Sequence, residues 1–296
     1  MLLAACGDSS APAAPDSGLV LLDLNSGAQV ASLSVGRDAV AVALSADSQT
    51  AYVADSSPGD VYAVRLSQRR IVWRAHTGGA PFGVLENNGR VYVSLYSSTF
   101  VDELDPATGK VLATHPVTQG PAALTVDGTG RVVAAGTHGE VDYFDGTPPL
   151  PAGHGFGIAA VGSELWTADY ERAELDRAGD LKVVGMPEPL FPFWLSAEPG
   201  GKLLIAAEGD PEDTSPGGVF EFDPVSGSFK TFAHPRDPDF VVRSRDTIFV
   251  AAHGEREVLA ISTAGAVKTF ARGLAAVALA PDVSLNLLVV AVNGHE

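Results

Sequence analysis

The chain contains a single cysteine, Cys6, among 296 residues, so no internal disulfide can hold its fold together. Positive charge is scarce as well: 19 Lys and Arg stand against 36 Asp and Glu, which gives a formal net charge of −17. This balance argues against nucleic acids and anionic membrane surfaces as partners, and favours cations or basic molecules. No apolar run in the sequence reaches the roughly 18 residues that a membrane-spanning helix requires.

Turn-forming residues are abundant, with 32 Gly and 20 Pro, and one turn formula recurs along the chain. It reads DLNSG at Asp23–Gly27, DPATG at Asp105–Gly109 and DPVSG at Asp223–Gly227. In this formula Asp accepts hydrogen bonds from nearby backbone amides, Pro presets φ, and Gly takes the position with positive φ. Short alternating segments flank each copy, which indicates β-hairpins.

A more apolar hairpin precedes the second and third of these turns, and seven such inner hairpins can be counted along the chain. The repeat units span 38–78, 79–119, 120–154, 155–189, 190–235 and 236–272, followed by a half unit at 273–296. A period near 40 residues with four strands is typical of a β-propeller. The half unit lacks two strands, and an unmatched outer hairpin lies at Leu19–Leu33. We therefore predict an all-β protein, a seven-bladed β-propeller with four antiparallel strands per blade, whose last blade is closed by the N-terminal and C-terminal strands.

The first residues have a different composition from the rest. The motif LAAC at Leu3–Cys6, followed by GDSSAPAAPDSG, resembles a bacterial lipobox at the end of a signal peptide. This resemblance implies lipidation of Cys6, and a periplasmic or cell-surface protein that contacts the membrane only through its anchor. An unmodified cysteine in a disordered leader is the alternative. Residues 1–17 are predicted to be leader and flexible tether, and residues 18–296 a single propeller domain.

Two segments resemble known propeller repeats. LSADSQTAYVAD at Leu44–Asp55 resembles the YVTN-type repeat of bacterial surface propellers. GSELWTADYERAELDRAGDLK at Gly162–Lys182 resembles the repeats of virginiamycin B lyases and of NHL-type and gluconolactonase-type propellers. The resemblance implies the propeller fold, while these families include both binding proteins and enzymes, so the activity stays open.

The ends of the second strands are expected to converge at one mouth of the central channel. Our alignment places these residues there: Asp55, Leu95, Gly136, Asp169, Glu208, His253 and Asn293. The positions that follow add Tyr96, His138, Tyr170 and Asp210. Strand-end Asp and Asn also cap their own loops frequently, which is the structural alternative for this ring. The aromatic segment LFPFW at Leu190–Trp194 lies either at this mouth or, as we expect, in the core.

Three functions follow from this arrangement. The first is a lipid-anchored binding or scaffold module for an unknown protein or small molecule, with Asp55, Tyr96, His138 and Tyr170 contacting the ligand. The second, implied by the gluconolactonase resemblance, is a lactonase with a divalent cation such as calcium or magnesium held by Asp169, Glu208 and Asn293. The third, implied by the lyase resemblance, uses His253 as general base and a nearby Glu as metal ligand, with His253 and Glu208 as the catalytic candidates.

Overall fold

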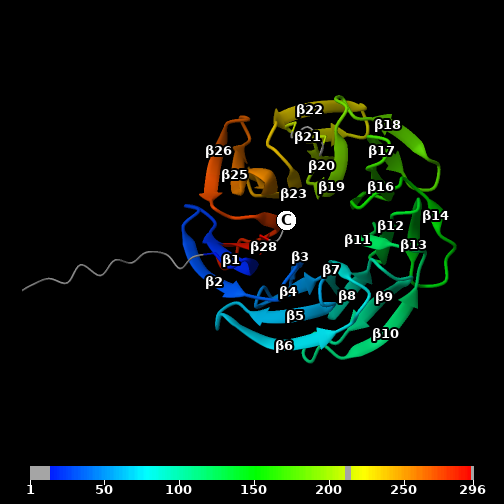
Figure 1. The fold of residues 1–296 in the computed structure, drawn as a ribbon. Coiled ribbons are helices and arrows are strands. Elements are labelled where there is room, and N and C mark those ends of the chain that lie inside the picture. The colour runs from blue at the N-terminus through cyan, green and yellow to red at the C-terminus, as the bar shows by residue number, and fades with distance from the viewer. Residues whose placement is uncertain (1–13, 211–214, 295–296) are drawn as a thin grey trace, which may run out of the picture.

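The computed structural model describes residues 14–210 and 215–294. Seven antiparallel sheets of four strands surround a central channel like the blades of a propeller (Figure 1). The predicted fold class is confirmed, and every predicted repeat unit corresponds to one sheet. The lipidation candidate Cys6 and most of the predicted leader lie outside the described residues.

Each blade runs from an inner strand beside the channel to an outer strand at the rim. The first two blades are β3 (Ala39–Leu44), β4 (Thr50–Asp55), β5 (Asp60–Arg65) and β6 (Arg70–His76), then β7 (Pro81–Asn87), β8 (Arg90–Leu95), β9 (Phe100–Leu104) and β10 (Val111–Pro116). The next two are β11 (Pro121–Val126), β12 (Val132–Gly136), β13 (Glu140–Tyr143) and β14 (Leu150–Pro151), then β15 (Ile158–Val161), β16 (Glu164–Asp169), β17 (Glu174–Arg177) and β18 (Lys182–Gly185). Blades five and six are β19 (Phe191–Glu198), β20 (Lys202–Glu208), β21 (Gly218–Asp223) and β22 (Ser228–Ala233), then β23 (Pro238–Ser244), β24 (Thr247–Ala252), β25 (Glu257–Ser262) and β26 (Val267–Arg272).

The seventh blade joins the two ends of the chain. Its strand order is β27 (Ala276–Asp282), β28 (Leu287–Asn293), β1 (Ser17–Asp23) and β2 (Gln29–Ser34), counted from the channel outward. Strand β1 pairs with β28 in an unbroken antiparallel register from Ser17–Asn293 to Asp23–Leu287. The N-terminal hairpin thus covers the edge of β28 that would otherwise be open, and the ring closes through backbone hydrogen bonds.

The recurring turns have the local chemistry that their sequence predicts. In the second copy, Asp105 Oδ1 accepts hydrogen bonds from the amides of Ala107 at 3.1 Å and Thr108 at 2.8 Å. Gly109 has a φ of 70°, which a residue with a Cβ adopts only under strain. These turns join the third and fourth strands and lie on the face opposite the predicted mouth.

The hydrophobic core consists of layers between adjacent blades. Second strands are buried along almost their whole length, as in β4 and β12. One layer packs the fully buried Trp166 of blade four against Phe220 and Phe222 of blade five. Because both faces of each inner strand are covered, the Ala, Val and Leu content of these strands follows from their position.

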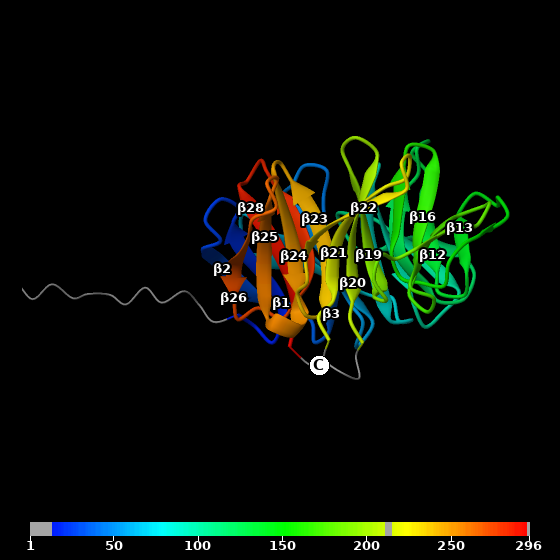
Figure 2. The ribbon, with the colours of Figure 1, turned by 90° about the horizontal axis from the view of Figure 1, so that it is seen from above.

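The described residues contain one short helix, the 3-10 turn η1 (His253–Glu255), directly after β24. No helix in the described part of the chain has the length and hydropathy to cross a membrane. Turn η1 lies on the face of the ring where β28 ends (Figure 2). This face carries the loops that join second to third strands, and with them most of the predicted site residues.

Candidate functional site

The hydrogen-bond register at the mouth shows that two rings of residues follow each other there. In blades one, two, three and six the residue after the second strand donates its amide to the carbonyl just before the inner strand: Ser56 to Asp38, Tyr96 to Ala80, Thr137 to Gly120 and His253 to Asp237. Asn293 makes the same bond to Ala275 at 2.8 Å. His253 and Asn293 therefore correspond to Ser56 and Tyr96, one position later than our sequence alignment placed them.

This single position decides where a side chain points, because side chains alternate along extended chain. In the first ring, the side chains of Asp55 and Asp169 are fully buried under the loops of the mouth. In the second ring, Ser56, Tyr96 and Asn293 line the central channel. The chemistry available to a channel ligand thus comes mainly from the second ring and from the inner strands.

The channel contains a cavity of about 510 Å³ that opens at this mouth. Aromatic side chains form much of its wall, namely Phe82, Tyr96, Phe156, Phe193, Trp194 and Phe240. The carboxylates of Asp38 and Asp239 and the amide of Asn293 contribute polar groups. None of the described residues that line this cavity is Lys or Arg.

Phe82, Tyr96 and Phe193 form one cluster around Phe156, and Trp194 packs separately on Phe240 with ring centroids 4.5 Å apart. The centroid of the Phe156 ring lies 5.6 Å from that of Phe82, 6.1 Å from Tyr96, 5.0 Å from Phe193 and 5.8 Å from Tyr170. The segment LFPFW supplies Phe193 and Trp194 to the cavity, so our expectation of core packing is wrong for Phe193, whereas Trp194 also packs against two core clusters. Mutual contacts hold the rings in place, which presents a preformed apolar surface.

The first-ring carboxylates have local partners. Asp55 accepts hydrogen bonds from the amides of Arg37 at 3.1 Å and Asp38 at 2.7 Å, and burial raises its pKa. Asp169 accepts from the Arg172 guanidinium at 3.1 Å and from the amide of His154 at 3.2 Å. Sequence reasoning missed Arg172, which stands three residues beyond the aligned strand end.

The other predicted residues also have identified partners. Tyr170 donates its hydroxyl to Glu208 at 2.6 Å, and burial followed by this hydrogen bond raises the pKa of Tyr170. Asn293 donates from Nδ2 to Asp38 Oδ1 at 2.6 Å. The structure thus joins Tyr170 with Glu208, whereas the three predicted metal ligands Asp169, Glu208 and Asn293 each bond a different partner. The exposed His138 lies with Nδ1 3.1 Å from the carbonyl oxygen of Gln119 and does not line the cavity.

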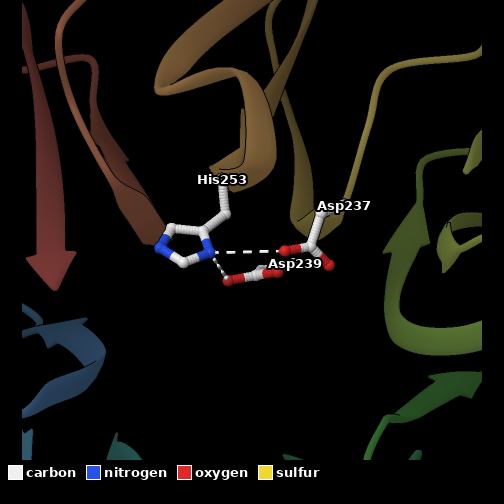
Figure 3. A group of neighbouring side chains, drawn as sticks. All are labelled: Asp237, Asp239 and His253. Carbon is white, nitrogen blue, oxygen red and sulfur yellow. Dashed lines mark hydrogen bonds and ion pairs between the residues drawn. The ribbon is translucent and has the colours of Figure 1, made fainter. Parts of the chain in front are cut away.

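A second cavity of about 240 Å³ adjoins the mouth and is lined by Glu208, Asp210 and Asp237, together with Arg236 and small residues. Between the two cavities lie Asp237, Asp239 and His253, whose side chains converge (Figure 3). His253 Nδ1 is 3.4 Å from Asp237 Oδ2 and 3.9 Å from Asp239 Oδ2. Within the described ranges this is the one group of three His, Cys, Asp or Glu side chains with potential ligand atoms within 4.8 Å of one another.

Sequence reasoning selected His253 but not the two carboxylates. Asp237 belongs to the linker that enters blade six, and Asp239 is the second residue of β23. A usable signal existed, because the pair Arg-Asp occurs at the entry of blade one (37–38) and again at the entry of blade six (236–237). Asp38 and Asp237 occupy equivalent positions, since the carbonyl of each accepts the amide that follows a second strand.

Comparisons with known proteins agree on the fold. No protein-family model matches the chain, and no curated protein sequence matches it. A streptogramin B lyase structure matches with a TM-score of 0.72 and 12% identity, covering 93% of this chain and 97% of that one. A catalytically inactive variant of virginiamycin B lyase from Staphylococcus aureus with quinupristin matches with a TM-score of 0.71 and 11% identity over 93% and 98% of the two chains. A functionally unknown protein from Desulfotomaculum acetoxidans matches with a TM-score of 0.69 and 14% identity over 87% and 96%. At these identities the likeness shows the shared propeller fold alone.

Proposed function

We propose that this protein is a binding propeller whose central channel takes a small organic ligand with an apolar or aromatic body and a cationic or hydroxyl-bearing group. The observation that carries the proposal is the cavity of about 510 Å³, with its aromatic wall and its carboxylates. Its volume is within the range of about 300–1,000 Å³ that small-molecule sites occupy.

The aromatic part of the cavity wall favours an apolar or aromatic body of the ligand, and the acidic part favours a cationic or hydroxyl-bearing group. The rings around Phe156 offer flat apolar surface, and their π-faces attract a positive charge. Asp38 and Asp239 add negative charge in a cavity that their surroundings partly shield from water. A carboxylate or phosphate ligand would meet like charge here without a lining Lys or Arg to compensate it.

A matched series of probes tests this preference on the full chain after chelator treatment. We expect benzyltrimethylammonium to bind more tightly than benzyl alcohol, and benzoate to bind weakest, in calorimetric titrations. The variant Phe156→Ala should weaken binding of the cation, while Phe232→Ala, in blade five and outside the cavity lining, should not. Equal affinities for the cation and benzoate would contradict the proposal, as would unchanged cation binding in Phe156→Ala.

We further propose that the propeller is anchored outside the cytoplasm through a lipid on Cys6, as its LAAC motif suggests. Two or three acyl chains would hold it stably, at about 0.8 kcal/mol per buried CH₂ group. Expressed in bacteria with a full export signal, the protein should partition into the detergent phase, and Cys6→Ser should move it to the aqueous phase. Equal partitioning of both forms would contradict lipidation.

A metal-dependent lactonase or lyase is the second candidate, and the group of His253, Asp237 and Asp239 at the cavity rim favours it. The structural neighbours include a catalytically inactive variant of virginiamycin B lyase with quinupristin. We expect, on this candidate function, that mass spectrometry detects ring opening of quinupristin or of a sugar lactone in the presence of a divalent metal. Absence of turnover with both substrates, together with binding of the organic cation, would leave the binding module as the function.

A further inference from the structure

The three side chains between the two cavities have the spacing of ligands to one ion. His253 Nδ1 lies 3.4 Å from Asp237 Oδ2 and 3.9 Å from Asp239 Oδ2, and all three potential ligand atoms lie within 4.8 Å of one another. Two donor atoms that bind the same metal at about 2.0–2.3 Å are separated by about 3–4 Å. The contact between Nδ1 and Asp237 Oδ2 is itself a long hydrogen bond when Nδ1 carries a proton, so a proton and a metal ion compete for this position.

The orientation of the imidazole is fixed from its other side. His253 Nε2 lies 3.2 Å from the backbone oxygen of Asn293, which can only accept a hydrogen bond, so Nε2 carries the proton. Figure 3 shows Nδ1 directed toward Asp237 and Asp239. In the neutral ring protonated at Nε2, this nitrogen carries the lone pair. Metal-binding histidines almost always have this arrangement, in which the second nitrogen donates to a carbonyl or carboxylate.

The surroundings give the group both rigidity and access. The side chain of His253 is 10% exposed. Its backbone amide donates a hydrogen bond to the carbonyl oxygen of Asp237 at 2.9 Å, which fixes the position of the backbone. Asp237 borders the smaller cavity and Asp239 the larger one, so open coordination positions would face both. The nearby Arg236 directs its guanidinium to the carbonyl of Gly254 at 2.7 Å.

From this geometry we infer that Asp237, Asp239 and His253 form a divalent-metal site at the rim of the central channel. One imidazole and two carboxylates favour borderline ions such as Zn²⁺, Mn²⁺ or Co²⁺ over Ca²⁺, which prefers oxygen ligands alone. A bound dication would offset the repulsion between the two carboxylates. The inference does not depend on which organic ligand fills the channel, and its residues differ from the ligands that we predicted from sequence.

Calorimetric titration of the chelator-treated full chain with Zn²⁺, Mn²⁺, Mg²⁺ and Ca²⁺ tests the site. We expect one saturable ion per chain in the micromolar range or tighter for Zn²⁺ and Mn²⁺, and weaker binding of Ca²⁺. Asp237→Asn and Asp239→Asn, which keep the side-chain shape, should each weaken binding by at least about tenfold. Asp47→Asn, in the turn between β3 and β4 on the opposite face, changes the net charge equally and should bind as the wild type does.

A spectroscopic measurement identifies the ligands without relying on affinity. Visible absorption of bound Co²⁺ should be present in the wild type and in Asp47→Asn, and should change or vanish in His253→Gln. Melting curves of all variants without metal establish that they are folded. Wild-type protein without saturable binding, or Asp237→Asn and Asp239→Asn variants with wild-type affinity, would overturn the inference. Neither result would affect the titrations with benzyltrimethylammonium, benzyl alcohol and benzoate, which are made on chelator-treated protein. The two proposals can therefore be refuted independently of each other.

Discussion

Replacing Asp176 by asparagine is expected to stabilise the protein at neutral pH and to leave its stability nearly unchanged near pH 4. Asp176, in β17, is 3% exposed, and its Oδ2 has no hydrogen-bond partner among the described residues. The carboxylate packs against Gly153, where an added Cβ would lie 2.4 Å from Oδ2. Burial, followed by the charges of Asp169 and Glu174, raises the pKa of Asp176 from 3.8 to about 6.

The sign of the effect follows from proton binding in the two states. Between pH 4 and 6 the unfolded chain has released this proton while the folded chain retains it, so stability falls as the pH rises through this window. Above pH 6 the folded protein carries the full cost of the buried charge. The difference between 3.8 and about 6, at about 1.36 kcal/mol per pH unit, amounts to about 3 kcal/mol. Relaxation of the site reduces this figure, so we expect a gain of about 1–3 kcal/mol for Asp176→Asn at pH 7.5.

Urea denaturation of wild type and variant at pH 4 and pH 7.5 measures this gain. Asp180→Asn in the same blade is a matched control with the opposite sign, because hydrogen bonding to Arg177 lowers the pKa of Asp180 to about 2. Removing the Asp180 carboxylate removes stabilisation that is present at neutral pH, so this variant should be less stable than the wild type at pH 7.5. The reasoning is refuted if Asp176→Asn is no more stable than the wild type at pH 7.5, or if its gain is equally large at pH 4.

Three further predictions concern the ring and its core. Deleting residues 18–34 exposes the edge of β28, so we expect the cooperative melting transition to disappear and light scattering to detect aggregation. A melting curve like that of the wild type would contradict closure of the ring through this hairpin. Arg243→Met leaves the Glu198 side chain, which is 3% exposed, without its ion-pair partner, and should lower the free energy of unfolding in urea by about 3–5 kcal/mol. Adding Glu198→Met to this variant should recover most of the lost stability. Gly155→Ala places a Cβ 1.5 Å from a backbone oxygen and should lower the free energy of unfolding by about 3 kcal/mol or more. Gly185→Ala meets open space and should change it by no more than about 1 kcal/mol. Equal effects of the two substitutions would show that the backbone at Gly155 moves to accept the methyl group.

The fold could be predicted because its signals are local and repeated. In the turn at Asp105–Gly109 the carboxylate, the hydroxyl of Thr108 and the positive φ of Gly109 involve only five consecutive residues. Closure followed from counting hairpins, since one unmatched outer hairpin and one unmatched inner hairpin together make a blade. Neither step required knowledge of contacts between distant side chains.

The sequence predicted that the candidate site residues gather at one mouth of the channel, but not their register. Strand β24 has the sequence TIFVAA and is almost entirely buried, so no alternation of polar and apolar residues marks which side chains face the channel. The sequence of this strand therefore does not reveal a shift of its alignment by one position, although this shift moves His253 from the ring of Asp55 to the ring of Tyr96. The carboxylates of Asp237 and Asp239 were missed because they come from the entry of blade six rather than from a strand end.

Buried carboxylates show why the consequences of one residue type differ between blades. Asp102, Asp142 and Asp176 occupy the same register position in the third strands of blades two, three and four, opposite Val93, Ala134 and Thr167. Asp102 accepts the hydroxyl of Thr114 at 2.7 Å, and Asp142 accepts that of Thr118 at 2.5 Å. These threonines stand 12 residues after and 24 residues before their aspartates, so no fixed spacing reveals the partner. Burial raises the pKa of Asp102 as well, but the hydrogen bond from Thr114 counteracts this effect. Oδ2 of Asp176 lacks such a partner among the described residues, so we expect the larger stability gain from replacing Asp176.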